Sequence, residues 1–118
     1  MKTRIAIIAT LLLSLISIAA HADDYHTRQA RRYTQEAEYY QKKADGYRRE
    51  AQYYLKKAER HQREAAYYTR KGNADRAKDY SRQADRALDN YKTKMRHAQK
   101  ADETAADYLK KAANALRR

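Results

Sequence analysis

Alanine and tyrosine recur at regular intervals along most of this chain. The segment that begins at Glu36 reads EAEYYQKKA, and closely related segments begin fourteen residues later at Glu50 and again at Glu64. A fourteen-residue repeat corresponds to two heptads of an α-helix and fits no β-strand repeat. The pattern therefore predicts a long helix with one apolar face.

Heptad positions a and d form that apolar face. With Ala37 at position a, alanine occupies every a position from Ala30 to Ala65. An aromatic ring occupies every d position over the same stretch, namely His26, Tyr33, Tyr40, Tyr47, Tyr54, His61 and Tyr68. We call this a/d face the seam. Its period of 3.5 residues predicts one left-handed coiled-coil helix over about residues 24–71.

Lys71, Gly72 and Asn73 are expected to end this helix and begin another. Glycine tolerates the left-handed conformation that follows many helix C-termini, and asparagine is a favoured N-cap. Alanine, tyrosine and leucine then recur with the heptad period over about residues 74–116, which predicts a second helix after a turn at 72–73. The stretch from Gly72 to Tyr80 resembles the inter-helix turn of a tetratricopeptide unit, and this resemblance implies only a tight helix–turn–helix.

The two seams complement each other if the chain folds back at the turn. Residues whose numbers sum to about 145 then face each other, so that Tyr40 faces Ala105 and Tyr68 faces Ala77. In seven of the twelve layers one aromatic ring meets one alanine, an alternation that fills a seam without voids or clashes. We therefore predict an all-α fold, a long antiparallel helical hairpin built as an Ala/Tyr heptad coiled coil.

A two-helix hairpin has a thin core, so we also expect a homo-oligomer, such as a dimer forming a four-helix bundle, or a protein partner. A second aromatic row supports this expectation, and we call it the tyrosine row. It contains Tyr25, Tyr39, Tyr53 and Tyr67 at position c, with Arg32 and Arg60 between them. The row is either an interface with another protomer or a ligand surface. In the second case its rings would stack on sugars or bases and its arginines would hold phosphates or carboxylates.

The beginning of the chain differs in composition from the rest. Lys2 and Arg4 precede an apolar run over residues 5–20, and a small-x-small motif ends at Ala22. This is the pattern of a secretory signal peptide with its cleavage site. The alternative is an uncleaved anchor, but sixteen apolar residues are few compared with the ~20 of a spanning helix. We therefore expect a signal peptide over 1–22 and a mature hairpin over 23–118, periplasmic or secreted and, because cysteine is absent, without disulfides.

The chain is strongly basic. Its formal net charge is +12, and loss of Lys2 and Arg4 with the signal peptide would leave +10. Much of this charge lies at heptad position f of the first helix. We name the residues at four consecutive f positions the basic ridge: Arg49, Lys56, Arg63 and Arg70. The ridge is either a solvated outer face or a contact surface for anionic partners. The partners we consider are lipopolysaccharide, peptidoglycan and anionic lipid, with nucleic acid less favoured.

No set of residues in the sequence suits catalysis. Ser81 is the only serine after residue 22, and Thr27 and Thr34 are expected on helices among charged residues. Acidic and basic residues alternate along the helix faces, as ion pairs four residues apart do, and a glycine-rich phosphate loop is absent. The histidines are too far apart for a metal site, and we expect no cofactor.

We therefore expect a protein that is not an enzyme. Our leading hypothesis is an exported, basic helical binding or structural protein of the cell envelope that acts on anionic surfaces or on partner proteins. The alternatives are a periplasmic holdase-type chaperone and an exported binder of nucleic acid or of a metal ion.

Overall fold

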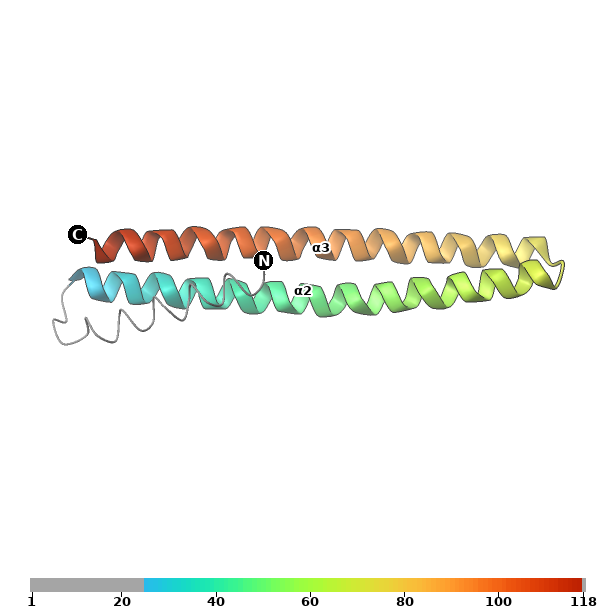
Figure 1. Cartoon of the computed structure of the whole chain (residues 1–118), viewed down its shortest axis with the longest axis horizontal. Helices are drawn as coiled ribbons and strands as arrows, with labels where there is room; N and C mark the ends of the chain where they lie inside the picture. Colours follow the sequence, from blue (N-terminus) through green and yellow to red (C-terminus); the bar gives the residue numbers. More distant parts are fainter. Residues whose placement is uncertain (1–24, 118) are drawn as a thin grey trace. The chain divides into compact units, whose positions relative to one another are not determined.

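The computed structural model describes residues 25–117 of the chain. Helix α2 spans Tyr25–Arg70 and helix α3 spans Ala74–Leu116, and a short turn connects them (Figure 1). The two helices are antiparallel, and residues 25–117 contain no β-strand. The predicted all-α antiparallel helical hairpin is therefore confirmed. The predicted signal peptide, residues 1–22, lies outside the described residues.

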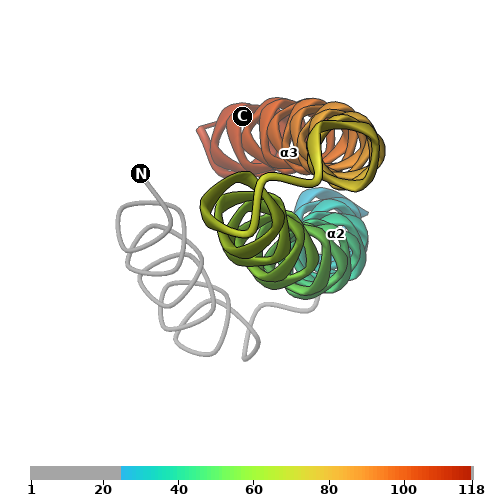
Figure 2. The ribbon, with the colours of Figure 1, turned by 90° about the vertical axis from the view of Figure 1, so that its right-hand side faces the viewer.

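The hairpin divides into two compact units. The first combines the part of α2 up to Asp45 with the part of α3 from Gln99 onward, and the second extends from Gly46 to Ala98 and includes the turn. In each unit a segment of α2 lies beside a segment of α3 (Figures 1 and 2). Neither described helix contains an apolar stretch of the length that a membrane crossing requires.

Alanines at position a form the core of both units. Five of them in α2 are completely buried, namely Ala30, Ala37, Ala44, Ala51 and Ala58. Helix α3 contributes buried alanines at both a and d, together with Leu109. The tyrosines at position d are half-buried, and Tyr33, Tyr40 and Tyr108 pack against the buried cluster of the first unit. The seam inferred from the heptads is thus the hydrophobic core.

Two threonines depart from the expectation for their positions. Thr27 and Thr34 lie at heptad position e and are buried, with exposures of 3% and 0%. The Thr34 hydroxyl donates a hydrogen bond to the carbonyl oxygen of Ala30 at 2.9 Å, which satisfies its polar group inside the helix. The buried face of α2 is therefore wider at this end than positions a and d alone.

The turn closes by the interactions that its sequence predicts. Gly72 has a φ of 75°, a conformation that strains any residue with a Cβ. The Asn73 N–H donates to the carbonyl oxygen of Tyr68 at 2.9 Å, and the Gly72 N–H donates to that of Thr69 at 3.1 Å. These bonds satisfy carbonyl groups at the end of α2. The Asn73 side-chain oxygen then accepts the N–H of Arg76 at 3.2 Å and caps α3.

Aromatic rings interleave across the seam. The Tyr108 ring of α3 lies between Tyr33 and Tyr40 of α2, at centroid distances of 6.2 and 5.8 Å. In the other unit the Tyr80 ring lies between His61 and Tyr68, at 5.9 and 5.5 Å. Successive d rings of α2 are seven residues and therefore ~10 Å apart, which leaves room for one ring between them. Each inserted ring lies in a layer where the residue numbers sum to 145 and the facing residue is an alanine.

Candidate binding surface

All four members of the tyrosine row are exposed. Their exposed fractions are 63% for Tyr25, 52% for Tyr39, 62% for Tyr53 and 47% for Tyr67. Each ring contacts the next residue's ring edge to face, and the three Tyr–Tyr pairs have centroid distances of 5.1–5.3 Å. The neighbouring seam ring thus restricts each exposed ring, which lowers the entropy that a ligand contact would cost.

Two lysines add positive charge to this row, Lys43 of α2 and Lys71 of the turn. The Lys43 ammonium lies over the Tyr39 ring at 5.3 Å and over the Tyr40 ring at 5.9 Å. Lys71 lies over the Tyr67 ring at 5.6 Å. A cation this close to a ring face is attracted to its π electrons. The lysines were not among the predicted contact residues, although the Tyr-x-x-x-Lys spacing that carries them is visible in the sequence.

The basic ridge is exposed at Arg49, Lys56, Arg63 and Arg70. Residues three apart are neighbours on a helix surface, so Lys56 adjoins Tyr53 and Arg70 adjoins Tyr67. Because both pairs lie in the unit that extends from Gly46 to Ala98, that unit presents aromatic rings and cations side by side.

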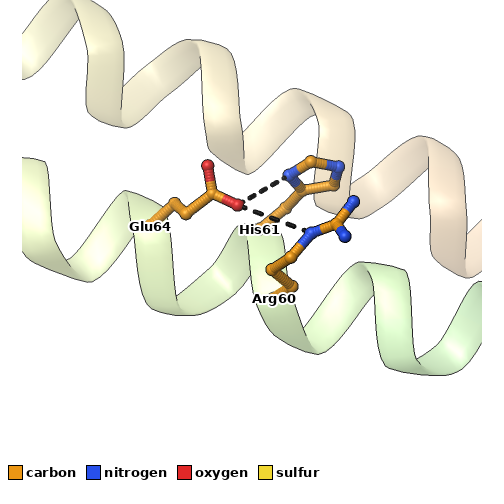
Figure 3. A network of polar contacts seen from close by, with 3 residues as sticks. All are labelled: Arg60, His61 and Glu64. Carbon is orange, nitrogen blue, oxygen red and sulfur yellow. Dashed lines mark ion pairs between the residues drawn. The ribbon is translucent and has the colours of Figure 1, made fainter.

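The two arginines within the tyrosine row differ in their surroundings. Arg32 is exposed. Arg60 is also exposed, but its Nε lies 3.7 Å from the Glu64 carboxylate, which lies 3.5 Å from Nδ1 of His61 as well (Figure 3). A hydrogen bond to the same carboxylate raises the pKa of Tyr80 on α3. Glu64 therefore contacts both Arg60 and the seam residue His61, so the Arg60 guanidinium already has an ion-pair partner.

Two cations of α3 contact α2 in the same unit. The Lys94 ammonium lies 2.7 Å from the Glu50 carboxylate and 5.8 Å from the centre of the Tyr47 ring, and the hydrogen bond to Glu50 raises the pKa of Lys94. Arg76 donates to the Tyr68 hydroxyl at 3.0 Å, which raises the pKa of Arg76. Lys94 occupies a d position, and these contacts show how a charged residue is accommodated in the seam.

Among residues 25–117 there is no group of three or more histidine, cysteine, aspartate or glutamate side chains arranged to hold a metal ion. The exposed side chains that lie side by side on α2 are tyrosine rings and cations. Comparisons with protein-family models, with curated proteins and with solved structures found no match for this chain.

Proposed function

We propose that this protein is an exported, basic helical binding protein that acts at the cell envelope on anionic surfaces such as lipopolysaccharide, peptidoglycan or anionic lipid. One observation carries the proposal: exposed tyrosine rings adjoin exposed cations on α2, as in Tyr53 with Lys56 and Tyr67 with Arg70. Such a surface offers a stacking face for a sugar ring and a charge for its phosphate or carboxylate.

The overall charge supports the same assignment. A net charge of +12 raises the local concentration of anionic partners and accelerates their association. The basic ridge lies opposite the seam, at position f, so it can contact a surface while the helices stay paired. Export rests on the signal-peptide pattern of residues 1–22.

Co-sedimentation with vesicles that contain lipopolysaccharide tests the surface. We expect the parent protein to bind at low salt and to bind much less at ~0.15 M salt, where charges are screened beyond about 8 Å. The variant with Arg49, Lys56, Arg63 and Arg70 replaced by glutamine should lose most of this binding while its far-UV circular dichroism stays unchanged. A matched control replaces four exposed cations of α3, namely Arg82, Arg96, Lys100 and Lys110. Equal losses in both variants would contradict a specific role for the ridge.

Mass spectrometry of protein recovered from the envelope or the medium tests export. The expected N-terminus of the mature chain is Asp23, because cleavage should follow Ala22. Recovery of the chain with residues 1–22 still attached, from the inner membrane, would instead favour an anchor.

A further inference from the structure

Two grooves open along the seam where alanine faces alanine. The 145 register pairs Ala58 with Ala87 in one unit and Ala30 with Ala115 in the other. Ala87 lines a groove of about 320 Å³, and Ala115 lines a smaller one of about 140 Å³. Seven other layers pair an alanine with an aromatic ring that fills the space between the helices, whereas two facing alanines leave space beside them. Ala44 and Ala101 form a third layer of this alanine–alanine kind.

The two grooves have corresponding linings. In both, the lining residues occupy positions d and g of α2 and positions c, d and g of α3. Both linings combine a tyrosine ring, side-chain amides and a lysine, and neither contains an acidic residue: Gln29, Tyr33, Lys111 and Asn114 line the smaller groove. In that groove Lys111 lies over the rings of Tyr33 and Tyr108, so its cation is already engaged there.

The larger groove has more free polar groups. Lys57 and Arg86 supply two cations from opposite helices, and Gln83 and Asn90 supply amides. Within residues 25–117, neither Lys57 nor Arg86 has an ion-pair partner. Two cations in a lining that contains no carboxylate favour an anion, and amides both donate to and accept from hydroxyl groups.

Two aromatic residues also line this groove. Tyr54 and His61 are seven residues apart on α2, which separates them by ~10 Å along the helix. The His61 side chain is only 9% exposed, and its Nδ1 lies 3.5 Å from the Glu64 carboxylate. The ring of His61 therefore contributes to the groove wall, while its Nδ1 lies beside a carboxylate.

We propose that this groove, formed by Tyr54, Lys57, His61, Gln83, Arg86 and Asn90 over Ala87, is a binding site for a phosphorylated monosaccharide unit. The volume of about 320 Å³ is at the lower end of the about 300–1,000 Å³ of small-molecule sites, which suits one sugar ring. Lys57 and Arg86 hold the phosphate, the amides bind hydroxyl groups, and the Tyr54 ring covers one face of the sugar. This site is independent of the envelope role proposed above, because calorimetry tests it with a free sugar phosphate and without an envelope surface.

Isothermal titration calorimetry with glucose 6-phosphate, glucose and inorganic phosphate tests the site on the chain that begins at Asp23. We expect saturable binding of glucose 6-phosphate that is tighter than that of either fragment alone. Arg86→Gln should raise the dissociation constant about tenfold, the effect of losing one charge-assisted hydrogen bond. Ala87→Leu should abolish binding by filling the groove without a change of charge, while helicity by circular dichroism is retained. Arg82→Gln is the matched control, because Arg82 is exposed on the same helix and does not line the groove.

The proposal is overturned if glucose 6-phosphate shows no saturable binding, or if Arg82→Gln weakens it as much as Arg86→Gln does. It is also overturned if Ala87→Leu folds and binds like the parent. If excess glucose 6-phosphate releases the protein from lipopolysaccharide vesicles, the groove takes sugar phosphates displayed on that surface. If glucose 6-phosphate binds in calorimetry but does not release the protein from the vesicles, the groove takes the free sugar phosphate. If the protein fails to bind vesicles but binds glucose 6-phosphate, only the proposed envelope role is contradicted.

Discussion

The Tyr108 ring stacks on the Tyr40 ring across the two helices, with centroids 5.8 Å apart and ring planes 14° apart. Tyr33 contacts the other side of Tyr108, so one ring of α3 joins two rings of α2. Both contacts lie over the cluster of Ala37, Ala105 and Leu109. An inserted ring therefore holds the two helices in one register, because a shift of one residue would remove it from between its neighbours.

Replacement of this ring should destabilise the hairpin. Tyr108→Ala removes a half-buried side chain and two ring contacts, and we expect a loss of about 1–3 kcal/mol in the free energy of unfolding. Urea denaturation followed by circular dichroism measures the change. Tyr53→Ala is the control, because its exposed ring has one ring partner and surface substitutions usually change stability by about 0.5 kcal/mol or less. Equal losses in the two variants would contradict a special role for the inserted ring.

The two glycines should respond to alanine in opposite ways. Gly46 lies inside α2, and a Cβ there would meet only the flexible end of Arg49 at 3.9 Å. Gly46→Ala should therefore stabilise the fold by about 0.5–1 kcal/mol, since glycine loses more backbone entropy in a helix. Gly72 has a positive φ with open space around it, so Gly72→Ala adds strain without a clash and should cost about 1–2 kcal/mol. Thermal melting measures the stability of both variants relative to the parent. Stability changes of the same sign would contradict the different roles assigned to the two glycines.

The seam and the turn could be predicted because their determinants are local or periodic. The seven-residue spacing placed Ala37 and Tyr40 on one face, and the Gly72-Asn73 pair has the chemistry of a helix end followed by a cap. The register followed because the turn at 72–73 determines which residues face each other, and this pairing brings seven aromatic rings opposite alanines.

Other features depend on side-chain conformation, which periodicity does not determine. The placement of Lys43 over the Tyr39 ring requires a particular rotamer, and the burial of Thr34 requires a wide contact at position e. The larger groove could not be predicted from the sequence, because its lining depends on the positions of the long side chains around Ala87. The basic ridge and the tyrosine row could be located on α2 from the sequence, because heptad positions f and c follow directly from the seven-residue period.

Engineered cysteines test the register directly. Tyr40 and Ala105 sum to 145, and a disulfide requires Cα atoms about 4.4–6.8 Å apart. We expect Tyr40→Cys with Ala105→Cys to form a disulfide within one chain, detected as a shift on non-reducing electrophoresis. Tyr40→Cys with Ala112→Cys is the control, because its second cysteine is displaced by seven residues, or ~10 Å. Efficient crosslinking of the control pair would show that the register is wrong.

Stability should fall in alkaline solution for an identifiable reason. The hydrogen bond to Glu64 raises the pKa of Tyr80, and the hydrogen bond to Glu50 raises the pKa of Lys94. Above pH ~10, where free tyrosine and lysine lose their protons, the folded chain then retains more protons than the unfolded chain. The free energy of unfolding therefore decreases as pH rises through this range, and the contribution is fully present below it.

Comparison with Tyr80→Phe isolates this effect. The phenylalanine ring retains the stack on Tyr68 but has no proton to lose, so unfolding free energies measured from pH 8 to 11 should decline less steeply than in the parent. Loss of net positive charge with rising pH acts on both proteins alike and cancels in the difference. Identical slopes would mean that the Tyr80–Glu64 hydrogen bond does not contribute to stability.

The final prediction concerns what the tyrosine row contacts. Replacing Tyr39, Tyr53 and Tyr67 by alanine removes three exposed rings and leaves every a and d residue of the seam in place. Each ring has one edge-to-face partner in the seam, so helicity at low temperature should persist with a modest loss of stability. If the row is an interface between protomers, sedimentation velocity should show an oligomer for the parent and a monomer for this variant, while the basic-ridge variant behaves as the parent. If instead the row contacts a ligand, the oligomeric state should stay the same and vesicle binding should fall with little change in its salt dependence, because stacking is screened less than charge pairing.

Replacement of the same three residues by phenylalanine is the matched control, since it retains the rings and should preserve whichever contact they make. A variant that keeps both the parent's oligomeric state and its binding would show that the row is merely exposed, and lost helicity would contradict the heptad assignment itself.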